Sequence, residues 1–131
     1  MYEVMVETNF SAAHSLRGYG KKCEELHGHN WKVQVFVKSE NLDNIGMVMD
    51  FKEMKRITKK VLRKLDHAHL NKVVPFTRIN PTAENIAKYI FEKLYSKVSP
   101  FGFSLEEVNV WESETSSASY SKTVEKTPQR S

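Results

Sequence analysis

The alternation of apolar and polar residues predicts three strands. Residues 2–14, 27–37 and 105–112 alternate between the two kinds, and successive side chains of a strand point to opposite faces of a sheet. In the second segment the odd positions carry two histidines, a tryptophan and three valines, so that His27 and His29 share the apolar face. Each strand is therefore expected to bury one face.

Helical periodicity predicts two helices between the second and third strands. Residues 50–53 (Asp-Phe-Lys-Glu) resemble a capping box with Asp50 as the N-cap, and apolar residues then recur at helical spacing as far as Leu65. Residues 80–82 (Asn-Pro-Thr) predict the start of a second helix, with Pro81 in the first turn, where its missing N–H costs little.

Length and composition indicate one cytoplasmic domain. The chain of 131 residues fits a single domain over 1–120, and the polar segment 121–131 is expected to be a disordered or lightly docked tail. No apolar run approaches the ~18 residues of a membrane span, and the first residues lack the basic and apolar regions of a signal peptide. The single cysteine excludes an intrachain disulfide and fits a reducing compartment.

The net charge of +4 and the pI near 9.1 are compatible with nucleic acid or with a small polyanion such as a phosphate ester. The first predicted helix carries a basic outer face, but no aromatic residues are interleaved to stack nucleotides, so we interpret it as surface. Arg17, Lys21 and Lys22 lie in a glycine-containing loop that is either simply solvated or contacts phosphates. We expect no direct nucleic-acid partner and no membrane partner.

Three histidines form a candidate metal site. His27 and His29 can present two imidazoles to one point, and His14 ends the first strand. If the two strands pair antiparallel, three neutral imidazoles can hold Zn²⁺ and leave a fourth position open. Histidines without a metal are one alternative. Because Cys23 lies four residues before His27, a structural Cys/His zinc site is another, whereas a nearby free thiol suits a catalytic base or nucleophile.

Other polar residues extend the candidate site. Asp66 precedes His67 in a predicted loop, where the two side chains can converge on one proton path. Glu112 closes an apolar strand face and needs a partner, which a planar ligand with two N–H donors would provide.

Taken together, these motifs resemble the 6-pyruvoyltetrahydropterin synthase family over roughly residues 2–120. The segments that carry the resemblance are Ala12-Ala13-His14, Cys23-x-x-x-His27-Gly28-His29, Leu65-Asp66-His67-x-x-Leu70-Asn71, Asn80-Pro81-Thr82-x-Glu84-Asn85 and Val110-Trp111-Glu112. The family fold implied is α+β, with a four-stranded antiparallel sheet and two helices on one face. The resemblance also implies homo-oligomers, in which trimers close into a barrel and stack as a hexamer with active sites at subunit boundaries.

The three residues between Cys23 and His27 look like the spacing of one branch of the family. That branch makes 6-carboxy-5,6,7,8-tetrahydropterin for the tRNA modification queuosine. The substrate implied is 7,8-dihydroneopterin triphosphate, which loses triphosphate and acetaldehyde.

The resemblance also assigns roles to individual residues. It implies that Zn²⁺ is held by His14, His27 and His29. The catalytic thiol maps to Cys23, and a proton relay maps to Asp66 and His67. The pterin anchor maps to Glu112, although a shifted alignment would place it at Glu114. The basic residues that hold the triphosphate are not identified and can come from another chain.

Three alternative functions remain open. The pyruvoyl-forming branch usually has a longer spacer before the second histidine. Side-chain cleavage to 6-hydroxymethyl-7,8-dihydropterin is the second, because Glu24 and Glu25 lie beside Cys23 and such relatives use a glutamate there. The third is a non-enzymatic basic binding module in which the histidines hold a structural zinc.

Overall fold

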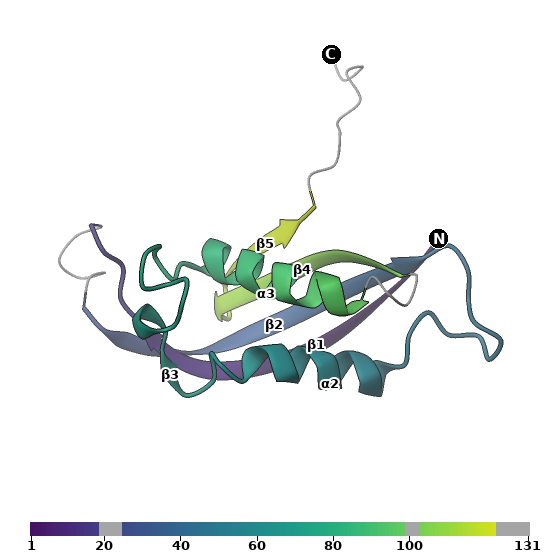
Figure 1. Ribbon diagram of the computed structural model, residues 1–131, viewed down its shortest axis with the longest axis horizontal. Helices are drawn as coiled ribbons and strands as arrows, with labels where there is room; N and C mark the ends of the chain where they lie inside the picture. The colour runs from purple at the N-terminus through teal and green to yellow at the C-terminus, as the bar shows by residue number, and fades with distance from the viewer. Residues whose placement is uncertain (19–24, 99–102, 123–131) are drawn as a thin grey trace, which may run out of the picture.

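In the residues that the structure describes, a five-stranded sheet carries two helices on one face (Figure 1). The computed structural model describes residues 1–18, 25–98 and 103–122. In chain order the elements are β1 (Tyr2–His14), β2 (His27–Ser39), α2 (Phe51–Leu62), β3 (Ala68–His69), the 3-10 helix η1 (Leu70–Lys72), α3 (Ala83–Val98), β4 (Ser104–Ser113) and β5 (Ser116–Ser121).

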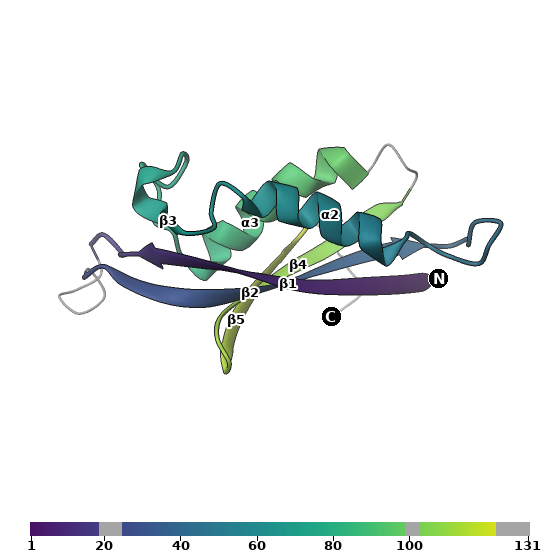
Figure 2. The ribbon, with the colours of Figure 1, turned by 90° about the horizontal axis from the view of Figure 1, so that it is seen from below.

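The sheet has the strand order β3-β1-β2-β4-β5, and Figure 2 shows both helices on the same side of it. The four long strands pair antiparallel, as the family fold implied. The difference is β3, two residues that pair parallel with Ala12 and Ala13 of β1. This short strand forms because the chain leaving α2 runs along the edge of β1, where Ser11 accepts a hydrogen bond from the backbone N–H of His67.

The first helix begins as the sequence predicted. Asp50 is the N-cap, and its side chain accepts a hydrogen bond of 2.9 Å from the backbone N–H of Lys52. Glu53 does not complete the capping box, since both of its carboxylate oxygens receive hydrogen bonds from Arg56. The helix ends at Leu62, before Leu65, and Leu65 is nevertheless fully buried in the turn that follows.

The second helix begins later than the sequence predicted. Its first residue is Ala83, and the carbonyl of Thr82 accepts the first helical hydrogen bond, from Ile86. The Thr82 hydroxyl also accepts a hydrogen bond from the backbone N–H of Asn85, as an N-cap does. Pro81 therefore lies before the helix instead of in its first turn, so its carbonyl is available to another segment.

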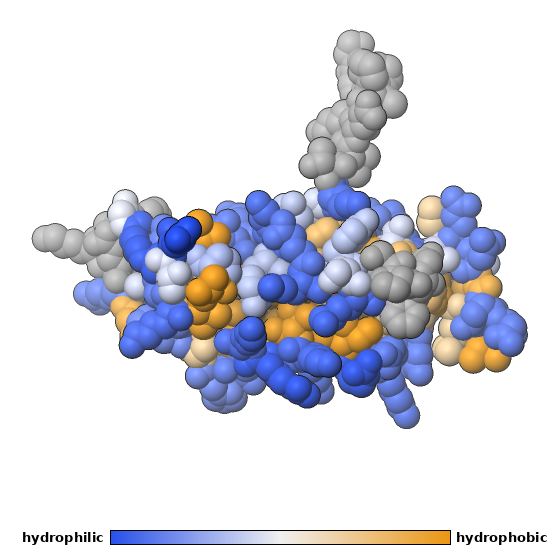
Figure 3. Space-filling view, in the orientation of Figure 1, coloured by the Kyte–Doolittle hydropathy of each residue, from blue (hydrophilic) through white to orange (hydrophobic). Residues whose placement is uncertain are grey.

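The core lies between the sheet and the helices. The odd positions of β2 from Trp31 to Val37 are buried, which confirms the predicted alternation. Apolar side chains fill the strip between α2 and α3, while hydrophilic ones gather over α2 (Figure 3). The basic residues of α2 are exposed, as expected of a solvated surface. No helix in the described ranges is long and apolar enough to span a membrane.

The last strand reaches the end of the expected domain. β5 pairs with β4 and ends at Ser121, and Lys122 then donates a hydrogen bond of 2.5 Å to the hydroxyl of Tyr95 on α3. Residues 123–131, most of the predicted tail, lie outside the described part of the chain.

Candidate metal and catalytic site

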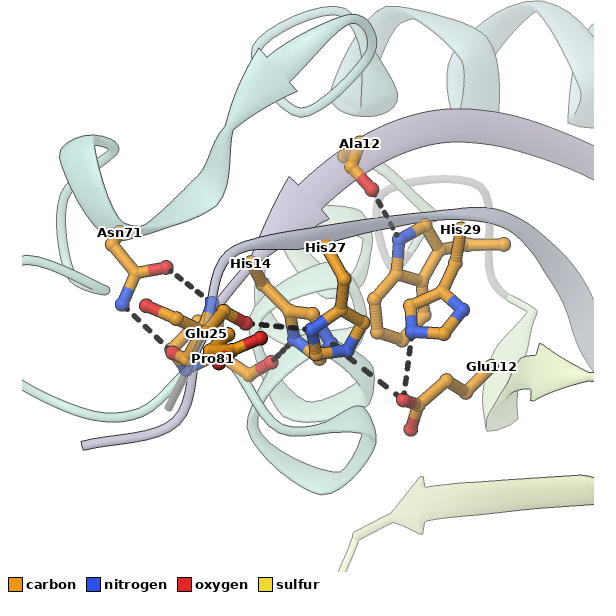
Figure 4. Close-up of polar contacts among 10 residues, drawn as sticks. Ala12, His14, Glu25, His27, His29, Asn71, Pro81 and Glu112 are labelled. Carbon is orange, nitrogen blue, oxygen red and sulfur yellow. Dashed lines mark hydrogen bonds and ion pairs between the residues drawn. The ribbon is translucent and has the colours of Figure 1, made fainter. Parts of the chain in front are cut away.

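The register of β1 and β2 brings the three predicted imidazoles together. His14 pairs directly with His27 in the antiparallel ladder, and His29 lies two residues further along the same face of β2. The Nε2 atoms of His14 and His27 are 3.1 Å apart, and the rings of His14 and His29 have centroids 5.2 Å apart. Figure 4 shows the three rings facing a common point.

Backbone carbonyls fix the protonation of two of these rings. Nδ1 of His14 lies 2.7 Å from the carbonyl oxygen of Pro81, and Nδ1 of His27 lies 2.8 Å from that of Glu25 (Figure 4). A carbonyl only accepts, so both Nδ1 atoms carry the proton, and each neutral ring presents a bare Nε2 to the other. Two lone pairs at 3.1 Å repel each other unless a cation lies between them.

Glu112 of β4 adds a carboxylate to the cluster. Its Oε2 lies 3.0 Å from Nε2 of His29 and 3.6 Å from Nε2 of His14. The closer contact is short enough for an ion pair but does not have hydrogen-bond geometry, so Nε2 of His29 is buried without a hydrogen-bond partner among the described residues. Such an atom is available to bind a metal.

Burial favours the neutral form of two of the imidazoles, those of His14 and His29. Trp31 lies beneath them, fully buried, with its ring edge-on to His14 and His29 and its indole N–H bonded to the carbonyl of Ala12. His14 is 1% exposed, and this burial lowers its pKa although the bond to Pro81 and the charge of Glu112 oppose the shift. Burial likewise lowers the pKa of His29. Neutral imidazole is the form that binds a metal.

The donor set fits a zinc ion. One ligand atom from each of His14, His27, His29 and Glu112 lies within 4.8 Å of all the others. Three imidazole nitrogens and at most one carboxylate oxygen form the ligand set of many zinc sites. The predicted triad is thus assembled within one chain, and Glu112, predicted as a ligand anchor, lies against it.

The predicted proton relay is assembled at a different place. Oδ1 of Asp66 lies 3.1 Å from Nδ1 of His67, within ion-pair distance, and accepts a hydrogen bond of 2.9 Å from the backbone N–H of Ser11. The side chain of His67 is 82% exposed, and its φ of 58° lies in the left-handed region. With Ser11, Gly28 and Asn30 it lines an open cavity of about 460 Å³.

This cavity lies on the face of the sheet without helices. Ser11 and Asn30 face each other across β1 and β2, and the Ser11 hydroxyl is 2.7 Å from the Asn30 side chain. By strand alternation both point away from the face that carries His14 and His29. Gly28 borders the same space, and a Cβ there would meet Ala12 only at 3.9 Å, so packing within the chain does not require glycine.

Of the other predicted residues, Cys23 lies outside the described part of the chain. Glu114, the alternative to Glu112, is exposed in the turn between β4 and β5. Glu112 is still in the strand and points to the imidazoles (Figure 4), so only Glu112 is part of the cluster.

The structure also reveals functional partners that the sequence did not. The carbonyls of Pro81 and Glu25 orient the two rings, and a backbone acceptor has no residue signature. Arg17, considered a possible phosphate contact, instead donates to backbone carbonyls of the loop before α3.

Comparison with known proteins identifies the family. The family model described as 6-pyruvoyl tetrahydropterin synthase matches residues 3–123, nearly the whole chain. The chain belongs to this family. It is therefore an enzyme of the pterin synthase kind, and the predicted recognition is confirmed.

Relatives within the 6-pyruvoyl tetrahydropterin synthase family carry more than one activity in their names. A putative 6-carboxy-5,6,7,8-tetrahydropterin synthase of Archaeoglobus fulgidus is 44% identical over 83% of this chain and 86% of its own length. A dihydroneopterin monophosphate aldolase of Pyrococcus furiosus is 36% identical over 83% and 88%. The structure of Caenorhabditis elegans 6-pyruvoyl tetrahydropterin synthase superposes with a TM-score of 0.80 at 33% identity, covering 94% of this chain and 98% of that one.

Proposed function

We propose that the protein converts 7,8-dihydroneopterin triphosphate to 6-carboxy-5,6,7,8-tetrahydropterin, with release of triphosphate and acetaldehyde. The observation that carries the proposal is the pair of bare Nε2 atoms of His14 and His27, which face each other at 3.1 Å. Beside them lies Nε2 of His29, which has no hydrogen-bond partner among the described residues. Relatives named for this reaction support it, among them one of Synechocystis that is 38% identical over 92% of this chain and 93% of its own length. The proposed setting is the cytoplasm, where one cysteine stays reduced.

His14, His27 and His29 would hold the zinc as neutral ligands. Bound zinc supplies Lewis-acid polarisation of the side-chain hydroxyls of the substrate, which acidifies the neighbouring C–H and O–H groups. The chain contributes the low-dielectric surroundings, because Trp31 excludes water from beneath the rings.

Cys23 is proposed as the base. Its thiolate would take a proton from a side-chain carbon of the pterin, with the sulfur becoming the thiol. The support is its position four residues before His27 in the sequence, which is the spacing of the carboxypterin branch. After triphosphate has left and the ring has gained two electrons from the side chain, one water adds to the first side-chain carbon. The bond between the first and second side-chain carbons then breaks, which leaves the carboxylate on the ring and releases the other two carbons as acetaldehyde.

His67 is proposed to move the second proton. Asp66 holds Nδ1 of His67, which leaves Nε2 free to give or take a proton at the exposed end of the ring. In a single chain this ring lines the open cavity that also borders His29, and no described contact joins His67 to the other imidazoles. We therefore propose that His67 serves the site of a neighbouring copy in a hexamer of two trimers, as the family resemblance implied.

Glu112 is proposed to anchor the pterin by accepting two parallel hydrogen bonds from N3–H and the 2-amino group. Its position at the mouth of the cluster supports this role, as does its half-exposed carboxylate. The role requires the carboxylate to leave the imidazoles when substrate is present. Replacement by glutamine is expected to raise KM while the zinc content stays the same.

Product analysis tests the proposal. The zinc-loaded protein is incubated with 7,8-dihydroneopterin triphosphate, and the pterin and any two-carbon fragment are identified. Acetaldehyde with a 6-carboxypterin is expected. A 6-pyruvoyl product without a fragment would assign the pyruvoyl-forming reaction instead. Cys23→Ala should abolish turnover with one zinc retained per chain, and unchanged turnover would remove the thiolate from the reaction.

Side-chain cleavage to 6-hydroxymethyl-7,8-dihydropterin is the second candidate. It is supported by the similarity to the aldolase of Pyrococcus furiosus and by Glu24 and Glu25 beside Cys23. Glycolaldehyde, or its phosphate from a monophosphate substrate, would identify it. A binding module with a structural zinc would instead lose its fold on chelation, whereas an enzyme of the proposed kind loses activity with its fold intact.

A further inference from the structure

Two asparagine side chains clamp the segment that follows His14. Asn71 accepts a hydrogen bond from the backbone N–H of Ser15 and donates one to its carbonyl, both at 2.9 Å. Asn80 does the same to Arg17, at 2.9 Å and 3.0 Å. Each amide thus pairs with the chain as a neighbouring strand would, and fixes both backbone groups of one residue.

Arg17 also bonds to the segment from η1 to α3, which carries the two asparagines. Its guanidinium donates to the carbonyls of Phe76 at 2.8 Å, Ile79 at 3.3 Å and Asn71 at 3.4 Å. The Asn71 carbonyl belongs to η1 and the other two to the loop between η1 and α3, and the planar fork of Arg can reach all three together. The loop and the segment after β1 therefore hold each other at several points.

The hydrogen bonds of the two asparagines lie next to His14 and next to the carbonyl that its ring contacts. Ser15, held by Asn71, is the next residue after His14. Pro81, the next residue after Asn80, supplies the carbonyl that accepts the Nδ1 proton of His14 at 2.7 Å. The side chain of Asn85 holds the Asn80 carbonyl as well, at 2.8 Å. Movement of Asn80 would displace the Pro81 carbonyl and release the ring.

We propose that Asn71, Asn80 and Arg17 are positioning residues for the metal site. They hold the Pro81 carbonyl against Nδ1 of His14, which keeps the proton on that nitrogen and leaves Nε2 bare and directed at the metal position. The inference deepens the proposed function, on whose zinc site it rests. It gives a physical role to the Asn-Pro-Thr segment, which the sequence identified only as a helix start.

The test compares two isosteric changes. Asn80→Asp keeps the acceptor for the Arg17 N–H but turns a carboxylate oxygen toward the Arg17 carbonyl, so that the clamp is broken. Asn109→Asp makes the same change on the helix-free face, where Asn109 donates to the Gln34 side chain at 3.2 Å. Both variants lose one hydrogen bond and gain one repulsion.

Zinc affinity is measured by competition with a chromophoric chelator, and the tautomer of His14 by ¹⁵N NMR of the metal-free protein. Asn80→Asp should bind zinc on the order of tenfold more weakly, as expected for loss of an outer partner of a ligand, and should show a mixed His14 tautomer. Asn109→Asp should match the wild type in both, while its unfolding temperature falls by a similar amount. A purely structural role would lower the unfolding temperature of both variants and leave zinc affinity and tautomer unchanged.

Arg17→Lys provides a second variant if Asn80→Asp does not fold, because it keeps the charge and removes the three-way fork. Zinc affinity within twofold of wild type in a folded variant, with the His14 proton still on Nδ1, would overturn the inference. If the wild type itself binds no zinc, the proposed function fails. The His14 tautomer in the metal-free variants then still decides for or against the clamp.

Discussion

The imidazole cluster and the Asp66–His67 pair are built in opposite ways. The cluster lies on the helix face with His14 buried and its other members partly buried, and it is supported by Trp31 and by backbone carbonyls. The pair is exposed on the sheet edge, with His67 in a left-handed conformation and lining a cavity on the other face. One chain thus holds a group of side chains that could bind a metal and, in a separate group, the proposed proton carrier.

This difference indicates how the catalytic work is divided. Metal binding needs neutral, closely spaced ligands, which a buried strand face provides. A proton carrier needs a titratable ring that reaches solvent or another molecule, which an exposed turn provides. In the proposed function the two requirements are met by separate groups of residues, and a second copy of the chain would bring them together.

The largest effect is expected from removing a ligand of the cluster. His29→Ala should lower zinc affinity by more than about 100-fold, because loss of even an outer partner of a ligand costs ~10- to 100-fold, and turnover should fall to background. Metal analysis after dialysis and a turnover assay measure both. Stoichiometric zinc in this variant would mean that the three imidazoles are not the ligands.

Removing His67 should separate activity from metal binding. His67→Ala is expected to lower kcat by roughly 10²- to 10⁴-fold, the usual contribution of a general acid or base, with zinc content and unfolding temperature unchanged. A loss of zinc in this variant would mean that His67 contributes to the metal site, which would contradict the separation of the imidazole cluster from the Asp66–His67 pair.

Mixing the two variants is the matched control. In a random one-to-one assembly half the chains keep intact imidazoles and half of their neighbours keep His67, so about a quarter of the wild-type rate should return if sites are shared between copies. No recovery on mixing would show that each chain completes its own site.

Acid should act on the cluster through His14 and His29. Burial lowers the pKa of both below the ordinary 6.5, so the unfolded chain binds protons that the folded chain does not. The metal-free protein should keep this stability above about pH 6.5 and lose it as the pH falls below that value, until the folded rings also protonate. Denaturant unfolding of the wild type and of His14→Ala across this range measures it, with a flatter profile expected for the variant. Parallel profiles would mean that the rings are not held neutral.

The smallest effect on stability is expected at Gly28. An added Cβ would lie 3.9 Å from its nearest neighbour, Ala12, so Gly28→Ala should change the unfolding free energy by no more than about 0.5 kcal/mol. The methyl group would nevertheless narrow the cavity beside His67, and turnover should fall. Full turnover in a stable Gly28→Ala protein would remove this cavity from the reaction.

Strand alternation made the cluster predictable. It placed His27, His29 and Glu112 on the apolar faces of their strands, and antiparallel pairing allowed His14 to meet His27, in a register that the structure supplies. The carbonyls of Pro81 and Glu25 were not predictable, because every residue has a carbonyl and only the folded loops bring these two to the rings.

Turns were harder to predict than strands. The position of His67 depends on a left-handed φ that periodicity does not encode, and β3 exists because of the path of that turn. Pro81 was expected inside α3, but the Thr82 hydroxyl caps the helix one residue later. The partners of Arg17, which was expected to be either solvated or in contact with phosphates, were not predictable either. Its carbonyl acceptors lie more than 50 residues away in sequence.

Zinc-edge X-ray absorption of the metal-loaded protein tests the central claim most directly. Three imidazole nitrogens at about 2.0–2.1 Å with oxygen in the remaining coordination are expected, which leaves the sulfur of Cys23 free to act as a base. A sulfur scatterer at about 2.3 Å, or fewer than three imidazoles, would contradict the account.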